Sequence, residues 1–169
     1  MRSLKFGFAF VLVSVGAAYA SPPQFYGKTV VVRWQEERIQ RMPGDDQFRP
    51  VSAAGEVGIS INDAGRAATR LSFSVQDPRA NRVRSGSKSV AGARVNFAGE
   101  TMTIGIQRGS ASAIQISVRF SGGFSGCTAR GVSGMTGGAS SSQTPSIVDG
   151  GSTAIRSVRI SGESCSIQN

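Results

Sequence analysis

The chain has 169 residues, with 19 Lys and Arg, 10 Asp and Glu and no His, which gives a formal net charge of +9. The length fits one domain, and a hydrophobic share of 39% is enough to build a core. Without His the chain can form no Ser-His-Asp triad, no Cys-His dyad and no His-ligated metal site. We therefore expect a protein that is not an enzyme and that uses neither a metal nor a cofactor.

The first twenty residues have the pattern of a cleavable export signal. Arg2 and Lys5 precede the apolar run Phe6–Val15, which is too short to cross a membrane, and Ala18–Ala20 has the small-x-small form of a cleavage site. The mature chain is then Ser21–Asn169, and loss of the two basic residues lowers the net charge from +9 to +7. We expect export to the periplasm or the medium, with no membrane-spanning segment after cleavage.

Apolar and polar residues alternate along much of the mature chain, and this period of two is typical of strands. The expected strands cover 30–34 (with an extension to 41), 57–61, 69–75, 93–97, 102–106 and 114–120, with weaker candidates at 127–132, 155–160 and 164–168. Asn62–Gly65 has the composition of a tight turn, so residues 57–75 are predicted to form a hairpin. Residues 93–120 are predicted to form a three-stranded antiparallel meander.

Two segments lack this pattern and are expected to be loops. Asp77–Ser89 contains Pro78, Gly86 and three serines. Ser121–Ser152 is dominated by Gly, Ser and Thr and has the composition of a flexible linker. The sequence leaves open whether this second segment is ordered.

About eight antiparallel strands with short turns predict an all-β fold in a single domain, 21–169. We prefer a small up-and-down barrel because the turns are local, and the alternative is a two-layer sandwich. Lipocalin-type barrels are an architectural analogy only, since Val32 and Arg33 precede Trp34 where those proteins have G-x-W. In a barrel, four aromatic residues would line an interior that is either filled or holds one small ligand. These residues are Trp34, Phe73, Phe97 and Phe120.

The chain has two cysteines, Cys127 and Cys165. In an oxidising compartment such a pair is expected to form one structural disulfide.

The motifs that suggest catalysis are weak. Glu36 and Glu37 are neighbours on a predicted strand, so their carboxylates point to opposite faces. Asp45-Asp46 follows Pro43-Gly44 in a predicted turn. Ser85–Lys88 matches S-x-x-K, but the other motifs of penicillin-recognising enzymes are missing. We predict no catalytic residue.

A cluster of basic residues in and after the first predicted loop is the most concrete surface feature. The guanidinium group of Arg binds phosphate or carboxylate groups through paired, forked hydrogen bonds. No aromatic residue occurs from Asp77 to Asn96, which argues against stacking of nucleic-acid bases. The candidate anion-binding residues are Arg79, Arg82, Arg84, Lys88 and Arg94.

The strings FYGKTVVVRWQEERIQR (Phe25–Arg41) and FSGGFSGC (Phe120–Cys127) resemble small exported bacterial proteins of uncharacterised function. The resemblance implies export and a single β domain, and it assigns no catalytic residue.

We expect a non-enzymatic binding protein of the cell envelope or medium, for an apolar or anionic ligand. Its partner would be an anionic envelope polymer or lipid, and nucleic acid is not expected. The alternative is a protein-interaction module, such as an inhibitor of an exported protease, that uses the Gly/Ser-rich loops near the disulfide. A hydrolase that uses carboxylates is the least favoured class. The oligomeric state stays open.

Overall fold

The computed structural model describes residues 21–41, 44–77, 81–107, 112–136, 142–145 and 152–169. The protein is all-β, as predicted. Within the described residues it consists of the 3-10 helix η1 (Pro23–Phe25) and the strands β1 (Thr29–Arg41), β2 (Arg49–Ile61), β3 (Ala67–Asp77), β4 (Arg82–Ser89), β5 (Arg94–Ala98), β6 (Thr101–Gln107), β7 (Ser112–Ser121), β8 (Gly126–Thr136), β9 (Ser142–Pro145) and β10 (Ser152–Gln168).

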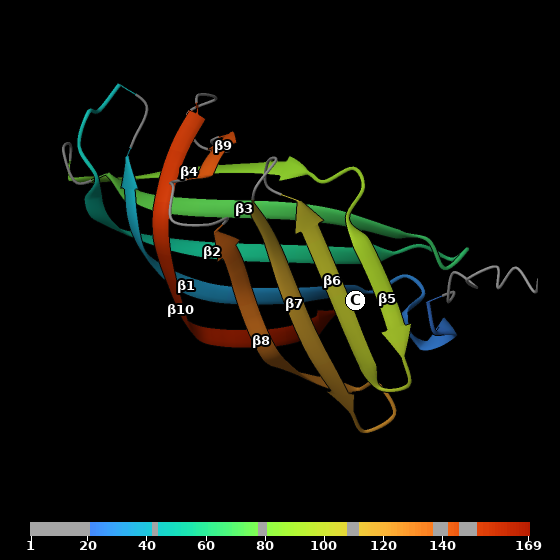
Figure 1. The fold of residues 1–169 in the computed structure, drawn as a ribbon. Helices are drawn as coiled ribbons and strands as arrows, with labels where there is room; N and C mark the ends of the chain where they lie inside the picture. The colour runs from blue at the N-terminus through green and yellow to red at the C-terminus, as the bar shows by residue number, and fades with distance from the viewer. Residues whose placement is uncertain (1–20, 42–43, 78–80, 108–111, 137–141, 146–151) are drawn as a thin grey trace, which may run out of the picture.

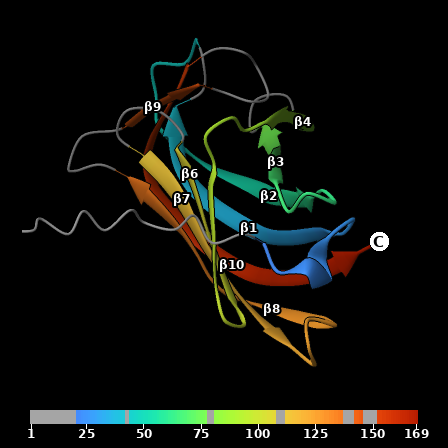
Figure 2. The same ribbon diagram turned by 90° about the vertical axis from the view of Figure 1, so that its right-hand side faces the viewer.

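The strands form two antiparallel sheets (Figure 1). The six-stranded sheet has the order β4-β3-β2-β1-β10-β9, and the four-stranded sheet has the order β5-β6-β7-β8. The longest strands belong to the first sheet, and Figure 2 shows β1 and β10 curving together. The second sheet crosses over one part of this curved surface (Figure 1).

The two sheets share one hydrophobic core. The inward-facing residues of β1, β2 and β3 pack with those of β5 to β8, and Phe25 of η1 joins them. Burial alternates along β2 and β3, as expected for strands with one buried face. The fully buried side chains include Val30, Ile59, Ile104 and Ile116.

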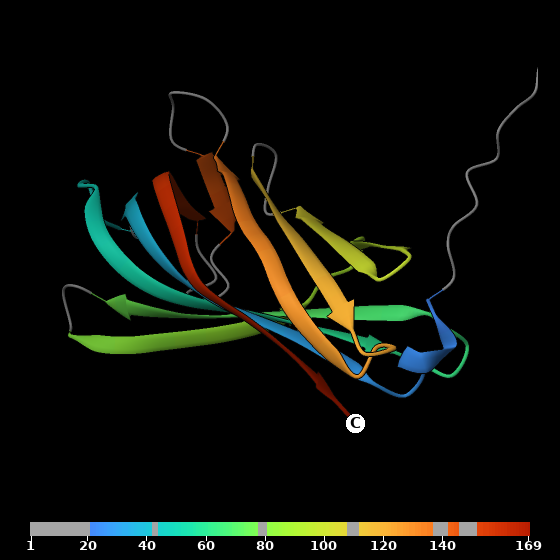
Figure 3. The ribbon, with the colours of Figure 1, turned by 90° about the horizontal axis from the view of Figure 1, so that it is seen from below.

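The two sheets form a sandwich, and the described strands form no closed barrel. β4 and β5 follow each other in the chain, yet they pair in different sheets. β8 and β10 lie side by side (Figure 3), but no backbone ladder joins them among the described strands. The preferred barrel is therefore not observed, and the two-layer alternative fits.

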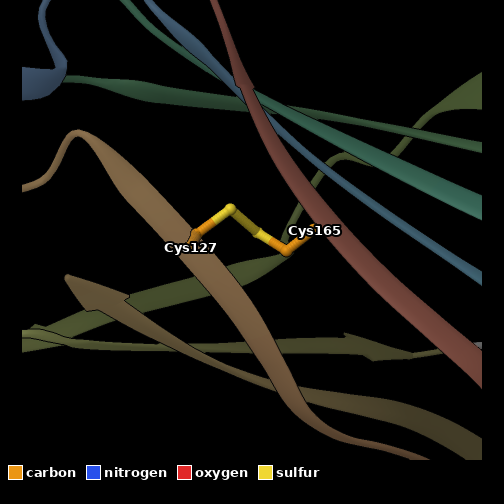
Figure 4. Close-up of a disulfide and its surroundings, with 2 residues drawn as sticks. All are labelled: Cys127 and Cys165. Atoms are coloured by element: carbon orange, nitrogen blue, oxygen red, sulfur yellow. A yellow bond between two sulfur atoms is a disulfide. The ribbon is translucent and has the colours of Figure 1, made fainter.

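The predicted disulfide is confirmed. Cys127 on β8 and Cys165 on β10 are bonded, with their Cα atoms 5.6 Å apart (Figure 4). The bond links the two sheets along one side of the sandwich, which we call the closed side. The opposite side, between the edge strands β4 and β5, is called the open side.

The predicted hairpin and meander are confirmed. β2 and β3 pair from Ile61↔Ala67 onward, and the side-chain oxygen of Asn62 accepts hydrogen bonds from the backbone N–H groups of Ala64 (3.0 Å) and Arg66 (2.9 Å). These bonds hold the turn together with two backbone bonds, from the N–H of Asn62 to the carbonyl oxygen of Arg66 (3.0 Å) and from the N–H of Gly65 to that of Asn62 (2.8 Å). β5, β6 and β7 pair in sequence order, as expected for a meander.

The prediction of a loop over Asp77–Ser89 is wrong for Asp77, the last residue of β3, and for 82–89, while 78–80 lie outside the described residues. Arg82–Ser89 forms β4, which pairs along its length with β3. An edge strand pairs with one neighbour, so only half of its backbone N–H and C=O groups are bonded within the sheet. In β4 neither face is buried in the core. Its sequence therefore carries no apolar alternation, although its backbone is regular.

The Gly/Ser-rich segment 121–152 also contains strands. β8 and β9 lie within it, and β8 covers the weak candidate at 127–132. The two weak candidates at 155–160 and 164–168 are one strand, β10. Gly162 has φ +63°, and it lies where the register between β1 and β10 shifts. A residue in this conformation allows the strand to continue past the irregularity.

Candidate anion-binding edge

β4 carries three of the five predicted anion-binding residues on one face. Arg82, Arg84 and Lys88 are separated by even numbers of residues, so their side chains point to the same side of the sheet. Their register partners on β3 include Val75 and Leu71, which are buried, so this side is the inner face. β4 is the edge of its sheet on the open side, and it contains no acidic residue.

The structure does not gather all five candidates into one cluster. Lys88 is six residues from Arg82, about 20 Å along an extended strand. Arg94 is the first residue of β5 and pairs opposite Gly105 in the other sheet. Arg79 lies outside the described residues. Arg82, Arg84 and Lys88 thus share one strand, whereas Arg94 lies on the other sheet with the parity opposite to that of the buried Phe97.

Arg84 has an acidic neighbour. Its Nη1 lies 3.8 Å from Oδ2 of Asp77, the last residue of β3, whose side chain is buried. Arg84 itself is about one-third exposed, whereas Arg82 and Lys88 are exposed. A basic side chain that neutralises a buried carboxylate contributes to the fold as well as to the surface charge. Arg82 and Lys88 are therefore the residues of β4 best placed to meet an anion.

A buried ionic cluster on β1 lies on the same inner face. The carboxylate of Glu36 accepts hydrogen bonds from Nε1 of Trp34 (2.6 Å) and from Nε of Arg38. Nη1 of Arg38 is 3.5 Å from Oε1 of Gln40, and its guanidinium stacks on the ring of Phe73, 4.7 Å from the centroid. Nη2 of Arg38 is buried and has no hydrogen-bond partner.

The register connects this cluster to β4. One row runs across four strands from Glu36 through Ala53 and Val75 to Arg84. Ala53 and Val75, together with Val51, form a small second apolar cluster. At this row the inner face of the sheet is no longer wholly apolar. The apolar residues Ala53 and Val75 lie in the middle of the row, and the charged residues Glu36 and Arg84 lie at its two ends.

Sequence reasoning missed this cluster, although a signal was present. Glu36, Arg38 and Gln40 have the same parity as Val30, Val32 and Trp34, and so they continue the buried face of one strand. The prediction that Glu36 and Glu37 point to opposite faces is confirmed, since Glu36 is buried and the side chain of Glu37 is 73% exposed. The two carboxylates therefore do not converge on one site.

The outer face of the same sheet carries an open groove of about 440 Å³. Its charged residues, Arg33 and Glu56, neutralise each other at 2.6 Å. Serines from β3 and β4 supply most of the remaining polar groups. Trp34 and Phe73 border the groove, but both side chains belong to the inner face and are buried, so neither offers an exposed ring for stacking. The groove is lined by Arg33, Trp34, Gln35, Ala54, Gly55, Glu56, Ser72, Phe73, Ser74, Ser85, Gly86 and Ser87.

The four aromatic residues predicted for the interior are all buried between the sheets. The rings of Trp34 and Phe73 meet edge to face at 5.9 Å. Phe97 and Phe120 stack at 6.4 Å, and both contact Phe25. These rings therefore pack against one another in two groups as part of the core.

The remaining catalytic motifs do not assemble. Ser85 and Lys88 are three residues apart on β4, so their side chains point to opposite faces of the strand. Over the described ranges, no group of three or more His, Cys, Asp or Glu side chains is arranged to hold a metal ion. Asp45 accepts a hydrogen bond from the backbone N–H of Gln47 at 3.1 Å, as an Asx turn does.

No family model, curated protein or solved structure matches the chain. No role can therefore be transferred to its residues from another protein, and the proposed roles rest on the structure of this chain. In the part of the chain that the structure describes, no helix is long and apolar enough to cross a membrane.

Proposed function

We propose that this chain is an exported, non-catalytic binding protein whose strand β4 binds anionic ligands. One observation supports the proposal above all others: an edge strand on the open side of the sandwich carries three basic residues and no acid. Two of these residues, Arg82 and Lys88, are exposed. Guanidinium and ammonium groups on a regular strand present repeated donors to carboxylate, sulfate or phosphate groups.

The charge of the whole chain supports the same proposal. A net charge of +9, or +7 after loss of the first twenty residues, attracts anions at long range and increases association rates at low salt. Attraction of this kind weakens within about 10 Å at 0.1 M salt, so specific binding requires local contacts. The basic residues of β4 supply such contacts on one face of a single strand.

Binding of a sulfated polysaccharide, heparin, to the protein Ser21–Asn169 tests the proposal. Titration calorimetry at increasing salt should give an affinity that falls as salt rises. Arg82→Ala and Lys88→Ala should each weaken binding and reduce its salt dependence. Each variant should leave the melting temperature nearly unchanged, because both side chains are exposed.

Arg119→Ala is the matched control. Arg119 is exposed on β7, on the outer face of the other sheet, so this variant removes the same charge from another surface. If it weakens binding as much as Arg82→Ala, the attraction comes from net charge alone and β4 is not the site. Absence of heparin binding at low salt would contradict the proposal altogether.

A further inference from the structure

The free edge of β4 is a second recognition element beside its side chains. Only β3 pairs with β4 among the described strands, and every second residue of an antiparallel edge strand points both its N–H and its C=O away from the sheet. The eight residues of β4 thus offer about four residues with outward backbone groups. Such an edge accepts a further strand by backbone hydrogen bonding.

The side chains of β4 restrict which strand can pair. Arg82, Arg84 and Lys88 lie on one face, and the other face carries Val83. Val83 is 65% exposed, and among the residues whose burial the structure describes it is the only large apolar side chain that is exposed. A complementary strand therefore has acidic residues on one face and an apolar residue on the other, opposite Val83.

A second copy of this chain does not satisfy this requirement. Antiparallel pairing of β4 with another β4 would place basic residues opposite basic residues, and like charges directly opposite each other destabilise a sheet. Basic residues on an edge are a common protection against such self-pairing. Charge complementarity instead favours a different polypeptide.

We propose that β4 adds an extended acidic segment of a partner protein to the six-stranded sheet. This inference rests on the proposed function and specifies its ligand: the anionic groups are carboxylates carried on a β-strand. Acidic residues at every second position of such a strand all lie on one face and repeat at about 6.6–6.8 Å, so that one of them can lie opposite Arg82 and another opposite Lys88. The partner's backbone pairs with β4, while its Asp and Glu side chains meet the exposed ends of the strand at Arg82 and Lys88.

A fluorescently labelled eight-residue peptide that alternates Glu with Val tests the inference by anisotropy. Two further peptides keep the same charge but carry N-methyl groups, one on the Val nitrogens and one on the Glu nitrogens. In a paired strand, alternate residues direct their N–H groups toward the neighbour, so either the Val or the Glu nitrogens must face β4. The peptide methylated on those nitrogens cannot donate hydrogen bonds to β4. That peptide should bind about tenfold more weakly or worse, since it loses two or more hydrogen bonds. On binding of the unmodified peptide, the amides of 82–89 should become protected from hydrogen exchange.

Charge reversal provides a test of side-chain pairing. Lys88→Glu should weaken binding of the Glu peptide, and a peptide with one Glu replaced by Lys at the matching end should recover it. Arg119→Glu is the control and should have no comparable effect, since Arg119 lies on the other sheet.

The outcomes separate the two proposals. Equal binding of all three peptides, without protection of 82–89, would overturn strand addition and leave anion binding by β4 intact. Binding of heparin but not of the Glu peptide would have the same meaning and would identify a polysaccharide as the ligand. If neither heparin nor the peptide binds, both proposals fail.

Discussion

Gly55 on β2 leaves room for a buried side chain that a Cβ atom would displace. It is the register partner of Trp34 on β1, and the indole lies across it. A Cβ atom at this position would be 2.7 Å from Nε1 of Trp34 and closer still to Cε2 and Cζ2. Carbon atoms in ordinary contact are about 3.5–4.0 Å apart, so Gly55→Ala requires the indole to move by about 1 Å.

The indole has little freedom to move. It is buried, it donates a hydrogen bond to Glu36 at 2.6 Å, and it contacts the ring of Phe73. Overpacking of a core costs about 1–3 kcal/mol, and loss of a hydrogen bond to a charged group costs about 1.5–3 kcal/mol. Removing a glycine from a strand returns about 0.5–1 kcal/mol. We expect Gly55→Ala to lower the free energy of unfolding by about 2–5 kcal/mol.

Urea denaturation followed by intrinsic fluorescence measures this loss at the site itself, because Trp34 is the single tryptophan of the chain. The midpoint should fall while the slope of the transition stays the same. Gly58→Ala is the matched control on the same strand, since its Cβ would lie 3.8 Å from Cγ2 of Thr29, an ordinary contact. A Gly55→Ala protein within about 0.5 kcal/mol of the wild type, or an equal loss from Gly58→Ala, would refute the reasoning.

Two further predictions concern the disulfide and the buried ion pair. Replacing Cys127 and Cys165 together by Ser should lower the free energy of unfolding by about 4 kcal/mol, because the bond closes a loop with a sequence separation of 38; unchanged stability in urea denaturation would contradict this. Glu36→Gln should cost about 3–5 kcal/mol, because Arg38 keeps a buried charge without its carboxylate. Adding Arg38→Met should recover most of that loss, and a double-mutant cycle without coupling would count against the pair.

The sequence predicted the strands that have one buried face. β2 and β3, and then β5 to β7, alternate apolar and polar residues because each presents one side to the core. β4 could not be found in this way. Its sequence, RVRSGSKS, has no apolar face, and its conformation depends on the backbone of β3 beside it. Local composition carries no information on such a long-range pairing.

The candidate site was predicted as a set of residues, without its geometry. Arg82 and Lys88 are close in the sequence, but the predicted loop assigned no face of a sheet to either side chain. The pairing of β4 with β3 shows that Arg82 and Lys88 lie on the same face of the sheet, six residues apart. The choice between barrel and sandwich also depended on tertiary pairing, because the short connection from β4 to β5 fits a continuing sheet and a change of sheet equally well.

The disulfide makes the two sides of the sandwich mechanically different. Along the closed side, Cys127 and Cys165 join β8 to β10 by a side-chain bond, whereas on the open side the chain itself joins the sheets through residues 90–93. The edge strands β4 and β5 each pair with one neighbour, so their amides should exchange before those of β1, which lies between two neighbours. Reduction of the disulfide should therefore increase exchange on the closed side, in β8 and β10, and leave the chain connection on the open side as it is.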